Sequence, residues 1–223
     1  MAIVTPLRAH PHNVIRDPER TRERILAGAL REFSAHGFAG ARVDRIARRA
    51  RINKRMLYHY FGNKEGLFKA ILSRKLGERL AWAAETPRDP GESLVFWFDI
   101  TCRDPDWVRL LQWEALEGGP GTISREAERQ RAFKLGVDQL RDRQAHGLLR
   151  ADLDPRQTLL AMMALTMFPV AFPQITRLAT GLRPMDPTFR KQRVEFLRRF
   201  AGALQPERAR PAARGSAGSG GRS

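Results

Sequence analysis

The sequence predicts an all-α protein, and three features support that prediction. Apolar residues recur at helical spacing, as in the stripe from Ile25 to Phe33. Glycine- and proline-rich stretches such as 118–121 separate the periodic segments. An aspartate that can cap a helix directly precedes a proline that suits its first turn in the pairs 17–18, 104–105 and 154–155.

The first predicted helix begins at Asp17-Pro18 and ends at Gly37. Its apolar stripe is expected to brace a small three-helix core with Phe33 and Phe38 inside. Residues 1–16 precede it as a flexible arm without periodicity. Three explanations compete for this arm: a disordered terminus, a contact with a minor groove or phosphates, and a fragment of a tag.

Residues 41–67 predict two short helices joined by a tight turn and running into a third. Asn53 suits the first residue of the second helix, because its side-chain oxygen can accept from free backbone N–H groups. Leu57 and Phe61, four residues apart, are expected to anchor that helix inward. The residues left facing outward are Lys54, Arg55, Met56, Tyr58, His59 and Tyr60.

Positive charge is concentrated in the same region. Residues 42–64 contain eight basic residues and one acid, and the whole chain has a formal net charge of +16. A helix of about two turns with such a face fits a DNA major groove, and the charge favours a polyphosphate partner through counterion release. A basic helical face that is merely solvated is the alternative.

Three segments, Asp44-Arg45-Ile46-Ala47, Leu57-Tyr58-His59-Tyr60-Phe61 and Asn63-Lys64-Glu65-Gly66-Leu67, resemble the tetracycline-repressor (TetR) family of bacterial regulators. The resemblance covers roughly Arg20 to Leu72. It implies an N-terminal three-helix helix-turn-helix DNA-binding domain and a C-terminal helical domain for ligand binding and dimerisation. Two departures concern the turn, where Arg51 stands in place of the usual Gly, and the helix start, where Ala41 and Arg42 replace a capping Ser or Thr.

On this resemblance, the recognition helix lies in the major groove and each side chain has an expected role. Lys54 and Arg55 read base edges, guanine above all, while Met56 and Tyr58 contact thymine methyl groups. Asp44 either accepts from cytosine or compensates for the missing cap. Lys64 is a cation at a helix start, which favours a phosphate contact over a stabilising role. Phosphates are held by Arg42, His59, Tyr60 and Lys64.

The expected domains are the arm at 1–16, the DNA-binding domain at 17–62, a linking helix at 63–86, the body at 87–204 and a disordered basic tail at 205–223. The last body helix, from about 187 to 204, is apolar on two faces. Phe189, Phe196 and Phe200 form one of these faces. A second apolar face predicts a two-fold dimer interface, and a central core helix is the alternative.

Aromatic and methionine side chains in the body predict an adaptable cavity for a mostly apolar small-molecule effector. Pro169 and Pro173 are expected to kink the helix that carries the methionines. A packed core without a cavity is the alternative. The candidate pocket residues are Trp97, Thr101, Trp113, Phe133, Met163 and Met167.

Other classes of protein find little support in the sequence. Cys102 and His146 fall on different predicted helices, and no phosphate loop, metal-ligand spacing or cofactor motif occurs, so we expect no enzyme. The longest apolar run, 159–172, is shorter than the roughly 20 residues of a membrane span and contains a proline. A single cysteine and the lack of a signal-type N-terminus favour the cytoplasm.

The sequence therefore predicts a homodimeric repressor of a DNA operator that an unknown small molecule releases, with no membrane partner. In two alternatives the protein still binds DNA. It is either a nonspecific architectural protein that binds DNA through charge alone, or a transcriptional activator of the same fold. A third is an enzyme with a vestigial DNA-binding head.

Overall fold

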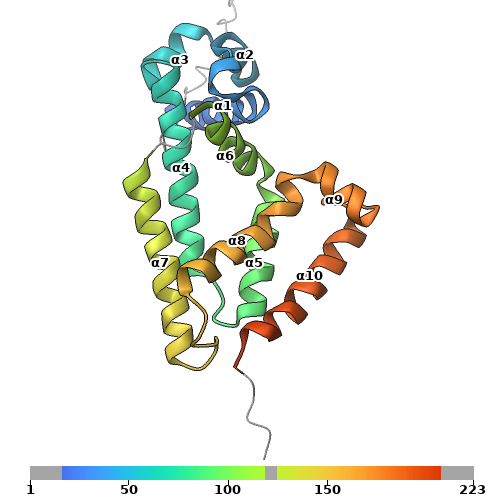
Figure 1. Cartoon of the computed structure of the whole chain (residues 1–223). Helices are drawn as coiled ribbons and strands as arrows, with labels where there is room; N and C mark the ends of the chain where they lie inside the picture. The colour runs from blue at the N-terminus through green and yellow to red at the C-terminus, as the bar shows by residue number, and fades with distance from the viewer. Residues whose placement is uncertain (1–16, 119–124, 207–223) are drawn as a thin grey trace, which may run out of the picture. The chain divides into compact units, whose positions relative to one another are not determined.

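The computed structural model describes residues 17–118 and 125–206, and every regular element in these ranges is helical, which confirms the all-α prediction. The arm at 1–16 and the tail from 207 lie outside the described residues. Figure 1 shows the helices in chain order. Their bounds are α1 Pro18–Gly40, α2 Val43–Ala50, α3 Lys54–Phe61, α4 Lys64–Ala84, α5 Pro90–Arg103, α6 Pro105–Gly118, α7 Glu126–Ala145, α8 Pro155–Ala171, α9 Pro173–Thr180 and α10 Pro187–Ala201, followed by a 3-10 turn at Gly202–Leu204.

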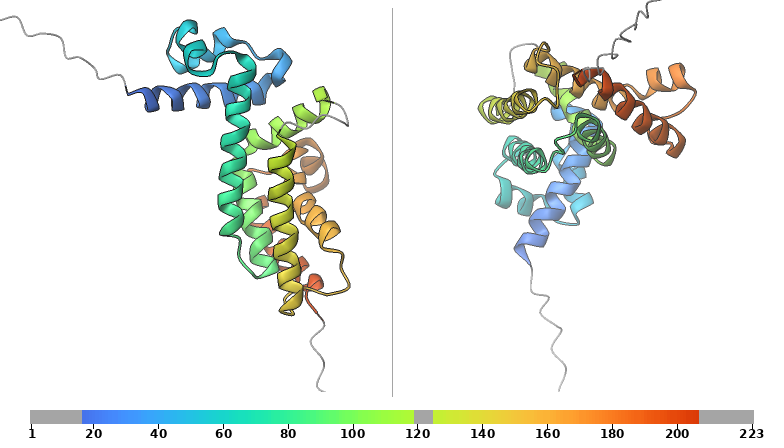
Figure 2. Two further views of the ribbon diagram at one scale, coloured as in Figure 1. Left: turned by 90° about the vertical axis from the view of Figure 1, so that its left-hand side faces the viewer. Right: turned by 90° about the horizontal axis from the view of Figure 1, so that it is seen from below.

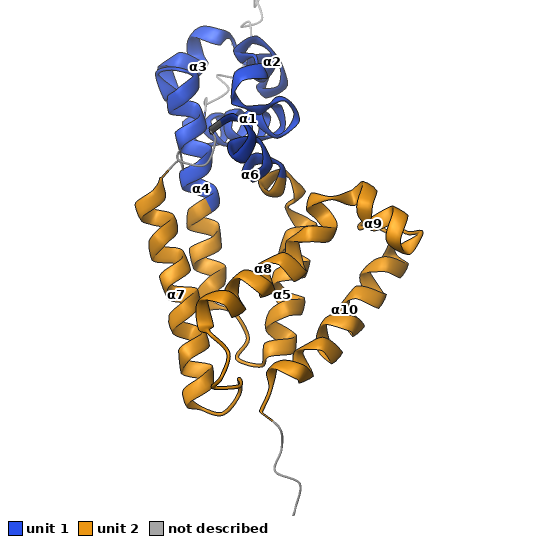
Figure 3. Ribbon diagram, in the orientation of Figure 1, with its two compact units in different colours: residues 1–75, 109–124 blue, residues 76–108, 125–223 orange. Residues whose placement is uncertain are grey.

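The chain divides into two compact units (Figure 3). Within the described residues, unit 1 contains 17–75 and 109–118, and unit 2 contains 76–108 and 125–206. Both α4 and α6 therefore contribute residues to each unit. Residues 109–118, which the sequence assigned to the body, pack with unit 1 instead.

The core of unit 1 follows the predicted apolar stripes. Its fully buried side chains include Ile25, Phe33, Ile46, Leu57 and Leu67, one or two from each of α1 to α4. The ring of Phe33 lies 5.0 Å from that of Phe68 and 6.0 Å from that of Phe38. The ring contacts join α1 to the start of α4, and the fully buried Leu57 shows that the inner side of α3 faces the core.

The sequence predicted that the first helix ends at Gly37, and α1 is interrupted at that residue. The side chain of Asp17 caps its start by accepting from the amides of Glu19 and Arg20, as expected. Gly37 has φ 69° and ψ −178°, a conformation open to glycine alone, and it kinks the helix. Helical structure then resumes to Gly40, because a single non-helical residue bends a helix without preventing another turn.

Unit 2 is built around α5, which packs against α8 and α10. Figures 1 and 2 show α7 alongside the lower half of α4, and Gln139 of α7 donates to the carbonyl of Ala83 at 2.8 Å. The core cluster consists of Leu94, Phe98, Cys102, Leu140, Leu149, Met162, Phe189, Leu197 and Ala201.

The sequence predicted a kink at the two prolines near residue 170, and the chain bends there by dividing into two helices. Pro169 lies inside α8, and the carbonyl of Leu165, which Pro169 cannot bond, accepts from Arg193 of α10 at 2.6 Å. Pro173 begins the separate helix α9, and Thr176 donates to the carbonyl of Pro169 at 3.1 Å. The chain turns by 89° between α8 and α9. Among the described helices none can cross a membrane by itself, and this bent pair meets only the length and composition requirement.

Helix α10 has one face in the core and one in solvent. Leu197 and Ala201 are fully buried. Phe196 and Phe200 are 45% and 39% exposed, with their rings stacked 5.7 Å apart. The sequence placed Phe189 with these two, but Phe189 is buried in the core. The exposed apolar face is therefore narrower than predicted.

Candidate DNA-binding surface

Helix α3 is fixed at both ends and on its inner side. Asn53 accepts the backbone N–H of Met56 at 2.7 Å, so the predicted cap is present. Leu57 is fully buried, and Gly62, with φ 74°, ends the helix. The helix is therefore held in one orientation with its remaining side chains directed away from the core.

The predicted outward residues of α3 are at the surface of unit 1. Lys54, Arg55 and His59 are exposed, and Tyr58 is 39% exposed. Met56 and Tyr60 are half-buried, and the ring of Tyr60 lies 5.8 Å from that of His59. This face combines cations, aromatic rings and hydrogen-bonding groups, which suits base edges and phosphates.

Asp44 pairs with Lys54 between the starts of α2 and α3. The Asp44 carboxylate lies 3.0 Å from Lys54 Nζ, and this hydrogen bond raises the pKa of Lys54. Asp44 lies in the first turn of α2, where a negative charge is favourable, and its suggested compensation for the missing cap stays a prediction. Arg42, next to Asp44, is exposed.

The cap of α2 comes from Glu32 of α1, which the sequence did not identify. Glu32 is fully buried, and its Oε1 accepts from the amide of Arg42 at 3.1 Å and from Arg45 Nε at 2.5 Å. Burial alone would raise the pKa of this carboxyl, but the hydrogen bonds from Arg42 and Arg45 hold it below its ordinary value. The sequence carried one indication of this role, since Glu32 is an acid directly beside Phe33 of the apolar stripe of α1.

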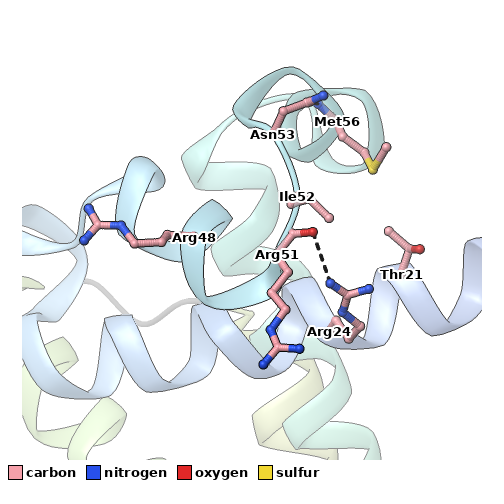
Figure 4. Close-up of a pocket in the computed structure, with 7 residues that line it drawn as sticks. All are labelled: Thr21, Arg24, Arg48, Arg51, Ile52, Asn53 and Met56. Atoms are coloured by element: carbon pink, nitrogen blue, oxygen red, sulfur yellow. Dashed lines mark hydrogen bonds between the residues drawn. The ribbon is translucent and has the colours of Figure 1, made fainter.

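The turn between α2 and α3 keeps left-handed backbone geometry without glycine. Arg51 has φ 52° and ψ 49°. The guanidinium of Arg24 in α1 donates to the carbonyls of Ala50 and Arg51, the latter at 3.1 Å (Figure 4). Arg24 therefore stabilises the end of α2 from outside that helix.

Beside this turn lies a basic hollow of about 530 Å³, drawn in Figure 4. Three arginines border it together with Asn53 at the start of α3. Guanidinium groups near a helix start favour an anion such as a phosphate. The lining residues are Thr21, Arg24, Arg48, Arg51, Ile52, Asn53 and Met56.

Lys64 has a structural partner in addition to its predicted role. Its Nζ donates to the carbonyl of Ala39 at 3.2 Å and lies 4.9 Å from the centre of the Phe38 ring. The cation at the start of α4 thus satisfies a carbonyl near the end of α1, which offsets its unfavourable place in the helix dipole.

The end of α6 packs on the kink of α1. Glu117 accepts the amides of Phe38 and Ala39 at 3.0 and 3.2 Å. Trp113 Nε1 donates to the carbonyl of Ser34 at 3.1 Å. Trp113, which the sequence placed in an effector pocket of the body, therefore lies in unit 1.

The other five expected pocket residues belong to unit 2. Trp97, Met163 and Met167 are half-buried, and Thr101 is buried and donates to the carbonyl of Trp97. Phe133, predicted to point inward, is 47% exposed. A pocket formed by these side chains stays a prediction.

Two family models match the chain. One, described as bacterial regulatory proteins of the tetR family, matches residues 25–71. The second, described as a tetracyclin repressor-like C-terminal domain, matches residues 89–201. The chain belongs to the TetR family. Unit 1 thus carries the helix-turn-helix of a TetR-family transcriptional regulator, and membership of this non-enzymatic family confirms the prediction that the chain is no enzyme.

Relatives of this TetR-family chain include two proteins named as repressors. It is 38% identical to the HTH-type transcriptional repressor SCO4008 of Streptomyces coelicolor over 170 residues, which is 74% of this chain and 86% of the relative. It is 33% identical to the repressor NicS of Pseudomonas putida over 162 residues, 67% of this chain and 76% of the relative. The solved structure of the putative transcriptional regulator SCO4942 from Streptomyces coelicolor superposes with a TM-score of 0.68 at 33% identity, covering 81% of this chain and 97% of that one.

Proposed function

We propose that this TetR-family regulator represses transcription as a homodimer on a pseudo-palindromic operator and that a small-molecule effector releases it. The observation that carries the proposal is the exposed basic and aromatic face of α3, with Leu57 buried beneath it and Asn53 capping its start. In a two-fold dimer, the two α3 helices would enter successive major grooves about 34 Å apart.

Each exposed group has a proposed contact. Lys54 and Arg55 read base edges, and Lys54 must leave Asp44 to do so. Met56 and Tyr58 contact thymine methyl groups. Arg42, His59, Tyr60 and Lys64 hold phosphates, and the hollow bordered by Arg24, Arg48 and Arg51 takes a further phosphate.

The proposed dimer interface is the exposed apolar surface of α8 and α10. Phe168 and Phe172, with rings 5.1 Å apart, are 47% and 46% exposed, and Phe196 and Phe200 form a second exposed pair. Aromatic side chains left in solvent in this number are typical of a protein interface. A second copy of the chain would cover them.

Repression is supported by the relatives, since SCO4008 and NicS are both named repressors. The effector would bind in the C-terminal domain. Binding would favour a dimer whose two α3 helices are wrongly spaced for DNA. The regulator is proposed to act in the cytoplasm, where its DNA is.

The test is to select bound duplexes from a random DNA pool and then to measure the molecular mass of the protein–DNA complex. We expect a pseudo-palindromic sequence bound by two chains. Arg55→Ala should relax the sequence preference at one base pair of each half-site. Lys64→Ala should lower the affinity for all DNA sequences alike. It should also reduce by about one the slope of log binding constant against log salt concentration.

A bound sequence without symmetry, or no sequence preference at all, would favour the nonspecific architectural alternative. Increased transcription from a promoter carrying the selected operator would indicate an activator instead. Screening small molecules for release of the selected DNA then tests the effector part of the proposal.

A further inference from the structure

Unit 2 contains a cluster of cations packed on indole rings, here called the Arg79 cluster and made of Arg79, Trp82, Asp104, Trp107 and Arg129. These residues come from α4, the α5–α6 junction, α6 and α7. The guanidinium carbon of Arg79 lies 4.7 Å from the Trp107 ring centre and 5.5 Å from that of Trp82. The guanidinium of Arg129 lies 5.7 Å from the same Trp107 ring.

The cluster is largely shielded from water, although Trp82 is only half-buried. The side chains of Arg79 and Asp104 are 16% and 12% exposed. Arg129 is 9% exposed and Trp107 is 5% exposed. Two guanidinium groups are thus desolvated around one indole ring, which is expensive unless anionic or hydrogen-bonding groups surround them.

The hydrogen bonding of Arg79 is incomplete. Its Nη2 lies 3.4 Å from the Asp104 carboxylate, at the long limit of a hydrogen bond. Its Nη1 is buried and has no hydrogen-bond partner within the described chain. An arginine fork offers five donors, so Arg79 can bind a further acceptor.

Arg143 shows how a structural arginine of the same unit is satisfied. It is 5% exposed, and its Nη2 donates to the carbonyl of Pro87 at 2.8 Å. Burial lowers the pKa of both arginines, that of Arg79 to about 10 despite the opposing charges of Asp104 and Glu78. Arg79 is likewise charged and largely removed from water. Within the described chain, however, its Nη1 has no acceptor such as the Pro87 carbonyl that serves Arg143.

We propose that Arg79 anchors the anionic group of the effector, a small organic carboxylate whose apolar body packs against Trp82 and Trp107. A carboxylate matches the guanidinium fork, and its bonds are strong where water is excluded. A cationic effector would be repelled by Arg79 and Arg129. The inference rests on the proposed effector-responsive function and gives the effector its chemical class.

The experiment uses the full-length protein and follows tryptophan fluorescence during titration with octanoate and benzoate. Octanamide and benzamide, of equal shape but neutral, are the ligand controls. We expect both acids to bind at least about tenfold more tightly than their amides. Arg79→Gln should remove that preference, and Arg143→Gln, a matched buried arginine, should retain it.

Circular dichroism and thermal unfolding check that each variant folds. If Arg79→Gln does not fold, Arg79→Lys keeps the charge but loses the fork, and we expect acid binding to weaken by about tenfold. The inference is overturned if neither acid binds, if the amides bind equally well, or if the folded Arg79 variant binds the acids as the parent does.

Operator binding is measured in parallel to separate this inference from the proposed function. If the parent protein binds its selected operator and the acids do not bind through Arg79, only the anionic anchor is wrong. If the acids bind through Arg79 but no specific DNA is bound, the anchor stands and the repressor proposal fails.

Discussion

The carboxylate of Glu32 in α1 accepts the backbone N–H of Arg42, 3.1 Å away, at the start of α2. The same oxygen accepts from Arg45, so a fully buried acid ties the first two helices of the DNA-binding domain together. The residue at the helix start supplies no cap of its own. The position of the helix-turn-helix therefore depends on an acid ten residues earlier in the chain.

Replacing Glu32 by Ala should lower the free energy of unfolding by about 2–3 kcal/mol. The change leaves the amide of Arg42 and the guanidinium of Arg45 without their acceptor at a partly buried site. Urea unfolding followed by circular dichroism measures the loss. Glu19→Gln, on the exposed first turn of the same helix, is the control and should change little. Equal stability of Glu32→Ala and the parent would contradict this role.

The same acid predicts a pH dependence. Because the folded protein holds the pKa of Glu32 below its ordinary value of 4.5, the unfolded chain binds the proton first as the pH falls. The stabilisation by Glu32 is complete above pH 4.5 and is lost as the pH falls through the folded pKa. Unfolding of Glu32→Gln should therefore depend less on pH below 4.5 than unfolding of the parent. Parallel curves for the two proteins would rule the prediction out.

Arg51→Gly should stabilise the domain by about 0.5–1 kcal/mol, since Arg51 has φ 52° and glycine adopts that conformation without strain. The bond from Arg24 to the carbonyl of residue 51 involves only the backbone there and should persist. Thermal unfolding checks the gain. Arg48→Gly removes the same charge from inside α2 and should cost about 0.5–1 kcal/mol. A loss of stability in Arg51→Gly would count against the strained turn.

Asp44→Asn should raise the affinity for DNA a few-fold. Lys54 is then free of its ion pair, and one negative charge next to the phosphates is removed. Fluorescence anisotropy with a labelled operator duplex measures the change. Asp138→Asn removes an equal charge from another exposed lysine pair, on α7 in unit 2, and should leave the affinity unchanged. Weaker DNA binding by Asp44→Asn would instead support a base contact by Asp44.

Gly37→Ala should destabilise the protein by roughly 2–4 kcal/mol. Its backbone conformation is closed to alanine, and the added Cβ would lie 2.2 Å from Glu117 Oε1 and 2.9 Å from the Trp113 ring. Gly40→Ala is the matched control, because its Cβ meets only His36 Cβ at 3.4 Å and the residue is helical. Chemical denaturation of the two variants should separate them clearly. Similar stabilities would show that the kink at Gly37 adapts.

Several local features of the fold could be predicted from the sequence. Asn53 caps α3, Asp17 caps α1 and Leu57 is buried, because each depends on residues within about one helical turn. The outward face of α3 could be predicted for the same reason. Where Phe189 and Phe133 point was predicted wrongly, since a periodic pattern does not tell which of two apolar faces meets the core.

The sequence by itself determined the all-helical class, the caps of α1 and α3 and the cationic face of α3, because these follow from side chains a few positions apart. Only the tertiary structure decided that Glu32 caps α2, that Arg193 bonds the carbonyl left open by Pro169, and that Trp113 and Glu117 pack on α1. In each of these contacts a side chain satisfies a backbone group of another helix, between ten and 79 residues away. Such a bond depends on how the helices pack, so it cannot be predicted from a local pattern of residues.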